Sequence, residues 1–585
     1  MSSAARRLAP TVRSSRVPRG LGVQGPGTGV VVVEHMKWWG WGQEGVAFHH
    51  EDKPNLAPFV KRVSGIDFDA PPAQVPELSE LEVPASRASQ ELREALVAAL
   101  GAEHVHDDDH DRVVHTYGKS MRDLVRVRRG DFGRVPDLIL YPGTEAEVEA
   151  VLRIALDADA VLIPFGGGSN IVGSLEAPRE ETRPVLSLDV GRMRAVLSLD
   201  ETAQTARIQA GALGPDLEAQ LNARGWTIGH FPDSFKHSTL GGWIATRSSG
   251  MQSDRFGDIA DITRAVRVVT PKGLVATSEV PVQSVGPSVR EMVLGSEGRL
   301  GIITEATVQV HRVAEERVIQ AYFFPDYASG LKAMHDIAAS DASPSITRVS
   351  DANETQFTLA TSKKGSPLGQ LLNKGVQLYA SKRKGFDLSE MCLSFIGFEG
   401  SSLGVRRNKA LVAEIVKKHG GFGVGSGPGT LYDQKKFDTP YIRDFILDRG
   451  AYGDVSETSS SWTTLKSLHD NVVAAAGKAF AEVGVKGFVF CHLSHSYHSG
   501  ACQYFTFAFQ PPTDRDGLEA YDVVKGAIQQ AFIDNGGTLS HHHAVGREHK
   551  RWVSEDLSPA GAEIVSTLFA GVDPGRNLNP GAIVD

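Results

Sequence analysis

The stretch Ala160-Val161-Leu162-Ile163-Pro164-Phe165 runs directly into Gly166-Gly167-Gly168-Ser169-Asn170. The apolar run predicts a buried strand, and the small residues after it leave backbone amides free to surround an anion. The spacing is neither that of a Walker A loop, which needs Gly-Lys-Ser/Thr, nor that of a Rossmann fingerprint. A plain tight turn is the alternative interpretation of the three glycines.

Short strands and amphipathic helices extend on both sides of this stretch. Thr144-Glu145-Ala146-Glu147 predicts a capping box, and the apolar residues after it predict a helix that ends before Ala160. Strands are expected near 136–142, 185–188, 205–210, 265–269 and 306–310, and a further helix at 88–101. After about residue 315 the pattern predicts helices near 327–339, 402–418, 463–483 and 515–535, and strands near 318–324, 392–398, 487–493 and 503–509. The fold class is therefore α+β with a second sheet.

Composition limits the possible functions. The chain has 585 residues, so more than one domain is expected, and a formal net charge of -9 argues against a nucleic-acid binder. Three cysteines at irregular spacing fit neither a disulfide framework nor a zinc site, which favours a reducing compartment. Residues 1–35 are rich in arginine, with no acidic residue before Glu34; a transit peptide, a disordered tail and an upstream start codon are the alternatives.

Two later segments repeat the combination of small residues and hydroxyl groups. One runs from Pro232-Asp233-Ser234 through Ser238-Thr239-Leu240-Gly241-Gly242 to Thr246-Arg247-Ser248-Ser249-Gly250, and the other is Gly295-Ser296-Glu297-Gly298-Arg299-Leu300-Gly301-Ile302-Ile303. Amides and hydroxyls with little side-chain bulk suit a pyrophosphate and a ribityl chain.

In this order the three segments resemble the FAD-binding domain of vanillyl-alcohol-oxidase-type (PCMH-type) flavoproteins. The resemblance implies two subdomains with FAD held between them, followed by an α+β substrate or cap domain and a C-terminal helical segment. The expected parts are an extension at 1–35, a helical region at 36–130, the FAD-binding domain at 131–313, the cap domain at 314–530 and the C-terminal segment at 531–585. The expected FAD contacts are Pro164, Phe165, Gly166, Gly167, Gly168, Ser169, Asn170, Asp233, Ser234, Ser238, Thr239, Thr246, Arg247, Ser248, Ser249, Glu297, Gly298, Arg299, Leu300, Gly301, Ile302 and Ile303.

Proton-handling residues gather late in the chain. Ser540-His541-His542-His543-Ala544 follows a glycine turn, and histidine exchanges protons near neutral pH. A metal site and a surface cluster are the alternatives, although adjacent histidines point in different directions and no flanking ligand has metal spacing. In the strand predicted at 503–509, alternation places Tyr504 and Thr506 on one face and Phe505 and Phe507 on the other.

Several segments together resemble the alkyl-dihydroxyacetonephosphate synthase family from about Met36 to the C-terminus. They are Met36-Lys37-Trp38-Trp39-Gly40-Trp41-Gly42, Gly229-His230-Phe231-Pro232-Asp233-Ser234, Gly241-Gly242-Trp243-Ile244-Ala245-Thr246-Arg247, Tyr441-Ile442-Arg443-Asp444, the Tyr504 strand and the triple histidine. The resemblance implies exchange of the acyl group of acyl-dihydroxyacetonephosphate for a fatty alcohol, through a covalent flavin N5 adduct and without net redox change. It implies FAD that is bound to the protein without a covalent bond. It also implies catalytic roles for Tyr504, His541, His542, His543, Arg348 and His230, and substrate binding by Arg443. No metal is expected.

A flavin oxidase or dehydrogenase acting on a 2-hydroxy acid such as lactate or glycolate is the second hypothesis. Such enzymes often carry His-Gly-Ile-Gly and metal-ligand histidines, whereas this chain has His542-His543-Ala544-Val545-Gly546.

The expected partners are the two lipid substrates and a second copy of the chain, with no nucleic acid. We expect a cytoplasmic protein with peripheral membrane contact, because no peroxisomal signal is recognisable. The basic and leucine-containing region 357–385 is the candidate docking surface, and an exposed solvated loop is its alternative interpretation.

Overall fold

The computed structural model describes residues 33–361, 375–435, 437 and 440–585, and Glu34–Asp585 form one compact unit. The expectations for residues 1–32 and for 362–374 lie outside the described residues. No helix within the described ranges is long and apolar enough to span a membrane.

The first sheet has four strands in the order β1 (Val105–His106), β2 (Leu138–Leu140), β4 (Val185–Asp189) and β3 (Val161–Phe165). Strands β2, β4 and β3 are parallel, and their apolar residues pack against α5 (Glu145–Asp157) and α2 (Gln90–Leu100). The strands and helices predicted here are confirmed. Strand β1 pairs with β2, so this sheet begins inside the region 36–130 that was expected to be helical.

The capping box predicted at Thr144 is only half present. The Thr144 hydroxyl accepts a hydrogen bond from the Glu147 amide, as predicted. The Glu147 carboxylate, however, accepts from the amide of Gly143 at 2.6 Å, one residue before the position that a capping box requires.

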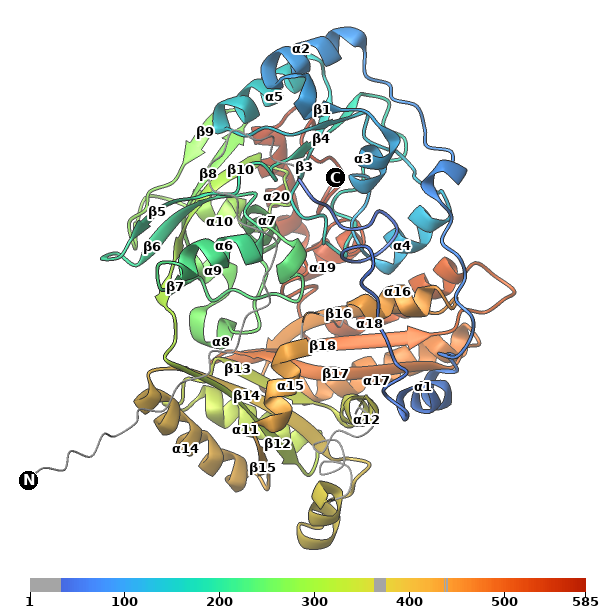
Figure 1. Cartoon of the computed structure of the whole chain (residues 1–585), viewed down its shortest axis with the longest axis vertical. Coiled ribbons are helices and arrows are strands. Elements are labelled where there is room, and N and C mark those ends of the chain that lie inside the picture. The colour runs from blue at the N-terminus through green and yellow to red at the C-terminus, as the bar shows by residue number, and fades with distance from the viewer. Residues whose placement is uncertain (1–32, 362–374, 436, 438–439) are drawn as a thin grey trace, which may run out of the picture. The chain divides into compact units, whose positions relative to one another are not determined.

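The second sheet is antiparallel, in the order β5 (Val196–Asp200), β6 (Thr205–Gln209), β10 (Ile302–Gln309), β8 (Thr263–Thr270) and β9 (Gly273–Ala276). Its core contains the buried rings of Trp226 and Trp243, and α7 (Leu240–Thr246) packs on β10. The two sheets and their helices form two subdomains, seen in the upper part of the molecule in Figure 1.

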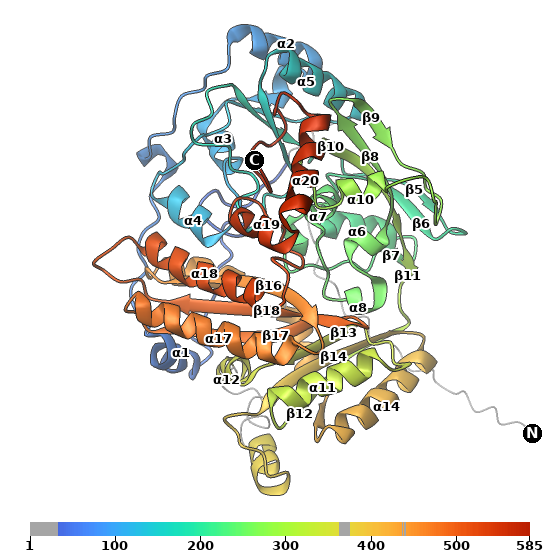
Figure 2. The same cartoon turned by 180° about the vertical axis from the view of Figure 1, so that it is seen from behind.

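The third sheet has seven antiparallel strands. Their order is β15 (Phe422–Gly425), β12 (Glu316–Phe324), β14 (Cys392–Gly400), β13 (Ile346–Ser350), β17 (Gly487–Ser496), β18 (Gly500–Phe509) and β16 (Tyr452–Ser461). Four helices cover one face, in front in Figure 2: α11 (Tyr327–Ala338), α14 (Ser402–Lys418), α17 (Leu465–Glu482) and α18 (Gly517–Asp534). The four strands and four helices predicted after residue 315 are confirmed, whereas β13, β15 and β16 were not predicted.

Alternation in β18 sorts its side chains as predicted. Phe505 and Phe507 are fully buried in the core beneath α17 and α18, while Tyr504 and Thr506 line the opposite side. The register places Glu457 of β16 and His492 of β17 directly across from Tyr504. Because directly paired residues share a face, these three side chains form one row on the face turned away from the helices.

The C-terminal segment returns to the first sheet. After α20 (Pro559–Val572), the Leu162 amide donates to the Asn577 carbonyl at 2.7 Å, and the Asn579 amide donates to the Leu162 carbonyl at 3.1 Å. The Leu578 side chain is fully buried in the core of that sheet. The end of the chain therefore extends the sheet that carries the glycine loop.

The glycine loop is pressed against the second predicted loop. A Cβ atom at Gly167 would lie 1.8 Å from the His237 carbonyl oxygen, and one at Gly166 would lie 2.4 Å from the Thr239 hydroxyl. Contacts this short exclude any side chain at Gly167, so the triple glycine is required by the approach of two loops and is more than a tight turn.

Replacing Gly167 with alanine should force the two loops apart and lower the free energy of unfolding by about 1–3 kcal/mol. Thermal unfolding should show a lower Tm than in the Gly242→Ala variant, because a Cβ at Gly242 meets only the Thr239 hydroxyl at 3.3 Å. A wild-type Tm for Gly167→Ala would contradict the close approach.

Candidate active site

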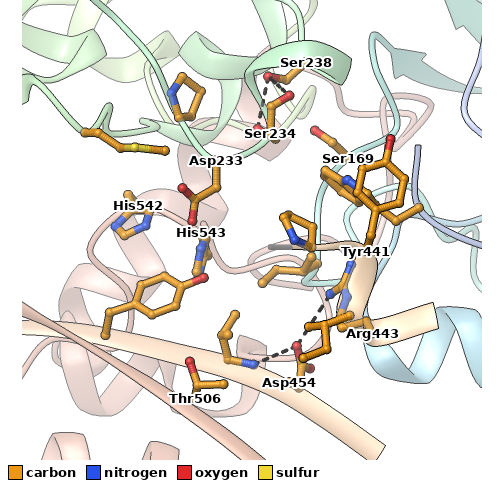
Figure 3. Close-up of a pocket in the computed structure, with 18 of the residues that line it drawn as sticks. Ser169, Asp233, Ser234, Ser238, Tyr441, Arg443, Asp454, Thr506, His542 and His543 are labelled. Carbon is orange, nitrogen blue, oxygen red and sulfur yellow. Dashed lines mark hydrogen bonds and ion pairs between the residues drawn. The ribbon is translucent and has the colours of Figure 1, made fainter. Parts of the chain in front are cut away.

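One cavity of about 1190 Å³ lies between the two subdomains and the face of the seven-stranded sheet opposite α11, α14, α17 and α18. Its volume exceeds the usual range for a small-molecule site, which leaves room for a large cofactor together with a substrate. Figure 3 shows part of its wall, where Asp233, Ser234 and Ser238 approach His542, His543 and Arg443 from the opposite side.

The three predicted loops meet at one end of this cavity. Nineteen of the expected cofactor-binding residues line it: Pro164, Phe165, Gly166, Gly167, Gly168, Ser169, Asn170, Asp233, Ser234, Ser238, Thr239, Thr246, Ser248, Ser249, Glu297, Gly298, Gly301, Ile302 and Ile303. Within the described part of the chain, the amides of Gly167, Gly168 and Ser169 have no hydrogen-bond acceptor. Unpaired amides beside several hydroxyls form a cradle that fits the pyrophosphate of FAD.

Three of the expected cofactor-binding residues lie outside the cavity wall. The Arg247 guanidinium lies 3.2 Å from the Glu291 carboxylate, and the Arg299 guanidinium donates to the Ala582 and Val584 carbonyls, each at 2.7 Å. Leu300 packs with Trp552 and Phe569 in the C-terminal core. Their side chains are engaged by Glu291, by C-terminal carbonyls and by the C-terminal core, so the structure does not bring them to the cradle, and their contact with FAD stays a prediction.

Glu297 lines the cavity but its carboxylate holds the protein together. It accepts hydrogen bonds from the Val545 amide at 2.9 Å, from the Gly546 amide at 2.9 Å and from the Ser174 hydroxyl. The residue therefore fixes the segment that follows the triple histidine, and its carboxylate is not available to the cofactor.

Glu457 holds the triple histidine from the other side. Its carboxylate accepts from three consecutive amides: His541 at 2.6 Å, His542 at 3.1 Å and His543 at 2.9 Å. The side chain is 1% exposed, and the Ser540 hydroxyl donates to it at 2.7 Å. Burial opposes its charge, but the three histidines and Ser540 hold the pKa of Glu457 well below its ordinary value.

His542 and His543 face the cavity beside Tyr504. The Tyr504 ring centre lies 6.0 Å from that of His542 and 5.4 Å from that of His543. Burial lowers the pKa of His542 well below its ordinary value and raises the pKa of Tyr504 well above it. At neutral pH the site thus contains a neutral imidazole that can accept a proton and a phenol that can donate one.

Two other predicted catalytic histidines lie outside the cavity wall. His541 turns toward Tyr497, with its Nε2 atom 2.6 Å from the Tyr497 hydroxyl. His230 is fully buried behind the second loop, where its Nε2 lies 2.8 Å from the Ser248 hydroxyl, and burial lowers its pKa to about 4. His230 can position Ser248, but it does not contact the reacting region.

Arg348 lies on β13 within an anionic surrounding. Its guanidinium donates to the Glu354 carboxylate at 2.7 Å, and that carboxylate also lies 3.0 Å from His492 Nδ1. Burial opposes ionisation of Glu354, but His492 and Arg348 lower its pKa to about 2.

The Asp233 carboxylate points toward His542 and His543 in Figure 3, so Asp233 belongs to the reacting region more than to the FAD cradle.

Arg443, on α16 (Tyr441–Leu447), lines the cavity at a third point. One of its terminal nitrogens lies 3.8 Å from the Asp454 carboxylate, which also accepts from Lys525 at 3.2 Å and from Tyr521 at 2.6 Å (Figure 3). Its Nε is buried without a partner among the described residues. An unsatisfied guanidinium donor at a cavity wall favours an anionic ligand such as a phosphate.

Metal-binding atoms also come close together here. Single ligand atoms of His495, Cys502, His541 and His542 lie within 4.8 Å of one another. His541 Nδ1 is paired with His542 Nδ1 at 2.9 Å, and His495 Nε2 lies 3.2 Å from the Gly250 carbonyl. A metal would have to displace these hydrogen bonds.

The far end of the cavity is apolar. On the sheet, the polar row Glu457–Tyr504–His492 is followed by rows that include Thr506 with Phe490 and then Ala508 with Phe488. Residues from other segments complete the wall there: Val46, Phe48, Val60, Val63, Ile66, Phe68, Phe357, Leu359, Ile442 and Ile446. This arm suits an alkyl chain.

Comparison with known proteins identifies the family. Residues 136–278 match the FAD binding domain family and residues 313–583 match the C-terminal domain of FAD linked oxidases. The chain is 36% identical to alkyldihydroxyacetonephosphate synthase of Dictyostelium discoideum, over 94% of each chain. It belongs to the alkyldihydroxyacetonephosphate synthase family.

The solved structures agree with this assignment. A structure of an alkyldihydroxyacetonephosphate synthase matches with a TM-score of 0.81 and 35% identity, over 93% of this chain and 98% of that one. p-Cresol methylhydroxylase matches with a TM-score of 0.62 at 15% identity, over 86% of this chain and 99% of that one, which shows the shared fold. The cofactor of this synthase-family chain is FAD, and the PCMH-type α+β fold is confirmed.

Sequence patterns alone did not indicate Glu457, His492 or Tyr497. Glu457 lies in Tyr452-Gly453-Asp454-Val455-Ser456-Glu457-Thr458-Ser459, which is too polar to predict a buried strand. The strand forms the edge of the sheet, and its pairing with β18 places Glu457 opposite Tyr504. A search for a carboxylate that could satisfy the amides of the histidine loop would have been the available signal.

Replacing Glu457 with glutamine should lower the free energy of unfolding by about 3 kcal/mol, because an amide cannot accept from all three histidine amides. The folded-state pKa of Glu457 is depressed, so its stabilisation is complete above its ordinary value of 4.5 and declines as the pH falls below it. Chemical denaturation from pH 7 downward should show the difference from wild type shrinking below about pH 4.5. Glu482→Gln, at an exposed helix end, is the control. Equal stability of Glu457→Gln and wild type at pH 7 would contradict this role.

Proposed function

We propose that this protein exchanges the acyl group of acyl-dihydroxyacetonephosphate for a fatty alcohol and releases alkyl-dihydroxyacetonephosphate and a fatty acid. The observation that carries the proposal is a single cavity that joins an FAD cradle, a phenol–imidazole pair and an apolar arm. The substrate has a phosphate, a ketone and a long chain, and the cavity offers a matching environment for each.

Arg443 is the proposed phosphate site. Its side chain lines the cavity on the same side as Tyr441 and Ser169 (Figure 3), and its buried Nε has no partner among the described residues. With the phosphate held there, an acyl or alkyl chain can extend along Phe48, Phe68 and Phe488 in the apolar arm. This arrangement leaves the carbon next to the ketone between Tyr504 and the flavin end of the cavity.

Proton transfer falls to His542 and Tyr504. His542 Nδ1 is engaged by His541, so Nε2 is the nitrogen left to accept a proton from the carbon next to the ketone. Tyr504 keeps its proton because of burial, so it can hydrogen-bond to the carboxylate as that group leaves ionised. It can then give its proton to the carbon next to the ketone as it takes one from the incoming alcohol. Bound FAD would lie in the cradle of Gly167, Gly168 and Ser169 and would supply an electron-accepting flavin ring to this site.

Lipid access and assembly extend the proposal. Phe357 and Leu359 line the apolar arm, and after residues 362–374 the chain presents exposed Leu378 and Tyr379 beside Lys382, Arg383 and Lys384. Exposed apolar and basic side chains of this kind fit peripheral contact with a membrane that supplies both lipids. A homodimer and a cytoplasmic location stay predictions from the sequence.

Purified enzyme with FAD should convert palmitoyl-dihydroxyacetonephosphate and hexadecanol to the ether product, measured by mass spectrometry together with released palmitate. Tyr504→Phe should reduce this exchange by about 100-fold while FAD stays bound, because only the proton donor is lost. Arg443→Gln should mainly raise KM for the phosphorylated substrate.

Tyr452→Phe is the matched control, since its hydroxyl contacts only Arg129 away from the cavity. Reduction of the flavin by lactate or glycolate, without ether formation, would overturn the proposal in favour of a 2-hydroxy-acid oxidoreductase.

A further inference from the structure

A chain of hydrogen bonds leads from the active site toward the protein surface. His542 Nδ1 lies 2.9 Å from His541 Nδ1, and His541 Nε2 lies 2.6 Å from the Tyr497 hydroxyl. That hydroxyl donates to the Asp258 carboxylate at 2.7 Å. Tyr497 and Asp258 are only partly buried, and the next residues, His498 and Ser499, are exposed.

The Asp258 carboxylate at the end of this series of hydrogen bonds determines which atom donates and which accepts in each of them. An ionised carboxylate only accepts, so Tyr497 donates its proton to Asp258 and its oxygen accepts from His541 Nε2–H. His541 Nδ1 then carries a lone pair and accepts from His542 Nδ1–H. The remaining nitrogen, His542 Nε2, is therefore unprotonated and directed to substrate, as a base must be.

Electrostatics agree with this direction. Burial and the Asp258 carboxylate raise the pKa of Tyr497 far above its ordinary value, so its hydroxyl stays protonated. Burial opposes the charge of Asp258, but His495, His541, Ser249 and Tyr497 lower its pKa below the ordinary value. An acid of low pKa gives up a transferred proton to water readily.

The proposed reaction requires such an exit. An ester and an alcohol give an ether and a carboxylic acid, and the acid ionises at neutral pH. Each turnover therefore releases one proton. His542 exports the proton that it takes from the carbon next to the ketone, the carboxylate leaves ionised, and the alcohol O–H proton passes through Tyr504 to that carbon in its place. Burial lowers the pKa values of His542 and His543, so these imidazoles do not retain the proton.

The Glu457 carboxylate lies beside these histidines but cannot carry the proton away. Glu457 is 1% exposed, and its two oxygens accept from the amides of His541, His542 and His543 and from the Ser540 hydroxyl. Its role is to position the loop.

We propose that Asp258, Tyr497 and His541 form a proton relay that exports the proton released at His542. The inference rests on the proposed exchange reaction. A proton taken up at His542 Nε2 displaces Nδ1–H to His541 Nδ1, His541 Nε2–H moves to the Tyr497 oxygen, and the Tyr497 proton moves to Asp258 and then to water. No electron is transferred, and one proton leaves for each ether formed. Tyr497 and Asp258 are thus relay residues that do not contact substrate.

Tyr497→Phe removes the oxygen from the relay but keeps the ring. In holoenzyme we expect kcat to fall about 10-fold or more, KM to change less than about twofold and FAD content to stay unchanged, because binding groups are untouched. The solvent deuterium isotope effect on kcat should rise as proton export becomes limiting, and added imidazole should restore part of the rate. Asp258→Asn should behave similarly.

The control is Tyr452→Phe, whose kcat and isotope effect should match wild type. Full activity of Tyr497→Phe with a wild-type isotope effect would overturn the relay. A slow variant that imidazole does not restore, with an unchanged isotope effect, would also overturn it, because that result indicates a structural role.

A second measurement separates the relay from the proposed reaction. Selective ¹⁵N-histidine NMR of the holoenzyme should show His541 as the Nε2–H tautomer and His542 as the Nδ1–H tautomer, with the His541 signal changed in Tyr497→Phe. Absence of ether synthesis by wild type with these tautomers present refutes the reaction alone. The opposite tautomers refute the relay, whatever the enzyme catalyses.

Discussion

The active site depends on the carboxylate of Glu457, which accepts hydrogen bonds from three consecutive backbone amides. Adjacent side chains cannot normally converge on one reaction, because they point in different directions. When the backbone amides of His541, His542 and His543 all donate to the Glu457 carboxylate, the three imidazole side chains point away from that carboxylate in different directions. His542 and His543 then reach the cavity, while His541 reaches Tyr497.

Glu457 has a counterpart on the other side of the same loop. Glu297, from the FAD-binding side, accepts from the amides of Val545 and Gly546. Residues 540–546 are therefore held between two buried carboxylates, one from the seven-stranded sheet and one from the third glycine segment. The proton-handling groups keep their position relative to the cofactor because this loop is tied to both walls of the cavity. Asn579 also holds this region, because its side-chain amide donates to the Glu297 backbone carbonyl at 2.7 Å.

The sequence predicted most of the fold because long apolar runs and clear helical faces dominate it. The glycine loop after β3, the helix from Glu145 to Asp157 and the sorting of Tyr504 from Phe505 all follow from local periodicity. Strand β16 was missed because its serines and acids resemble a loop, and it acquires strand structure only by pairing with β18. That single omission also concealed Glu457.

Motifs indicated which segments meet, but not what each side chain contacts. Arg299 lies in the correct loop, yet its guanidinium holds the C-terminus, and Asp233 faces the histidines across the cavity. Such assignments depend on tertiary contacts between residues hundreds of positions apart, which local patterns do not encode. Tyr497 is a further example, because its importance comes only from its position between His541 and Asp258.

The most direct test of the account follows oxygen through the reaction. The holoenzyme is incubated with unlabelled palmitoyl-dihydroxyacetonephosphate and with hexadecanol that carries ¹⁸O in its hydroxyl group. The ¹⁸O content of both products is then measured by mass spectrometry. Exchange at the carbon next to the ketone predicts ¹⁸O in every ether product and none in the released palmitate. Hexadecyl palmitate that carries the label, or dihydroxyacetonephosphate released without ether, would show attack at the ester carbonyl and contradict the account.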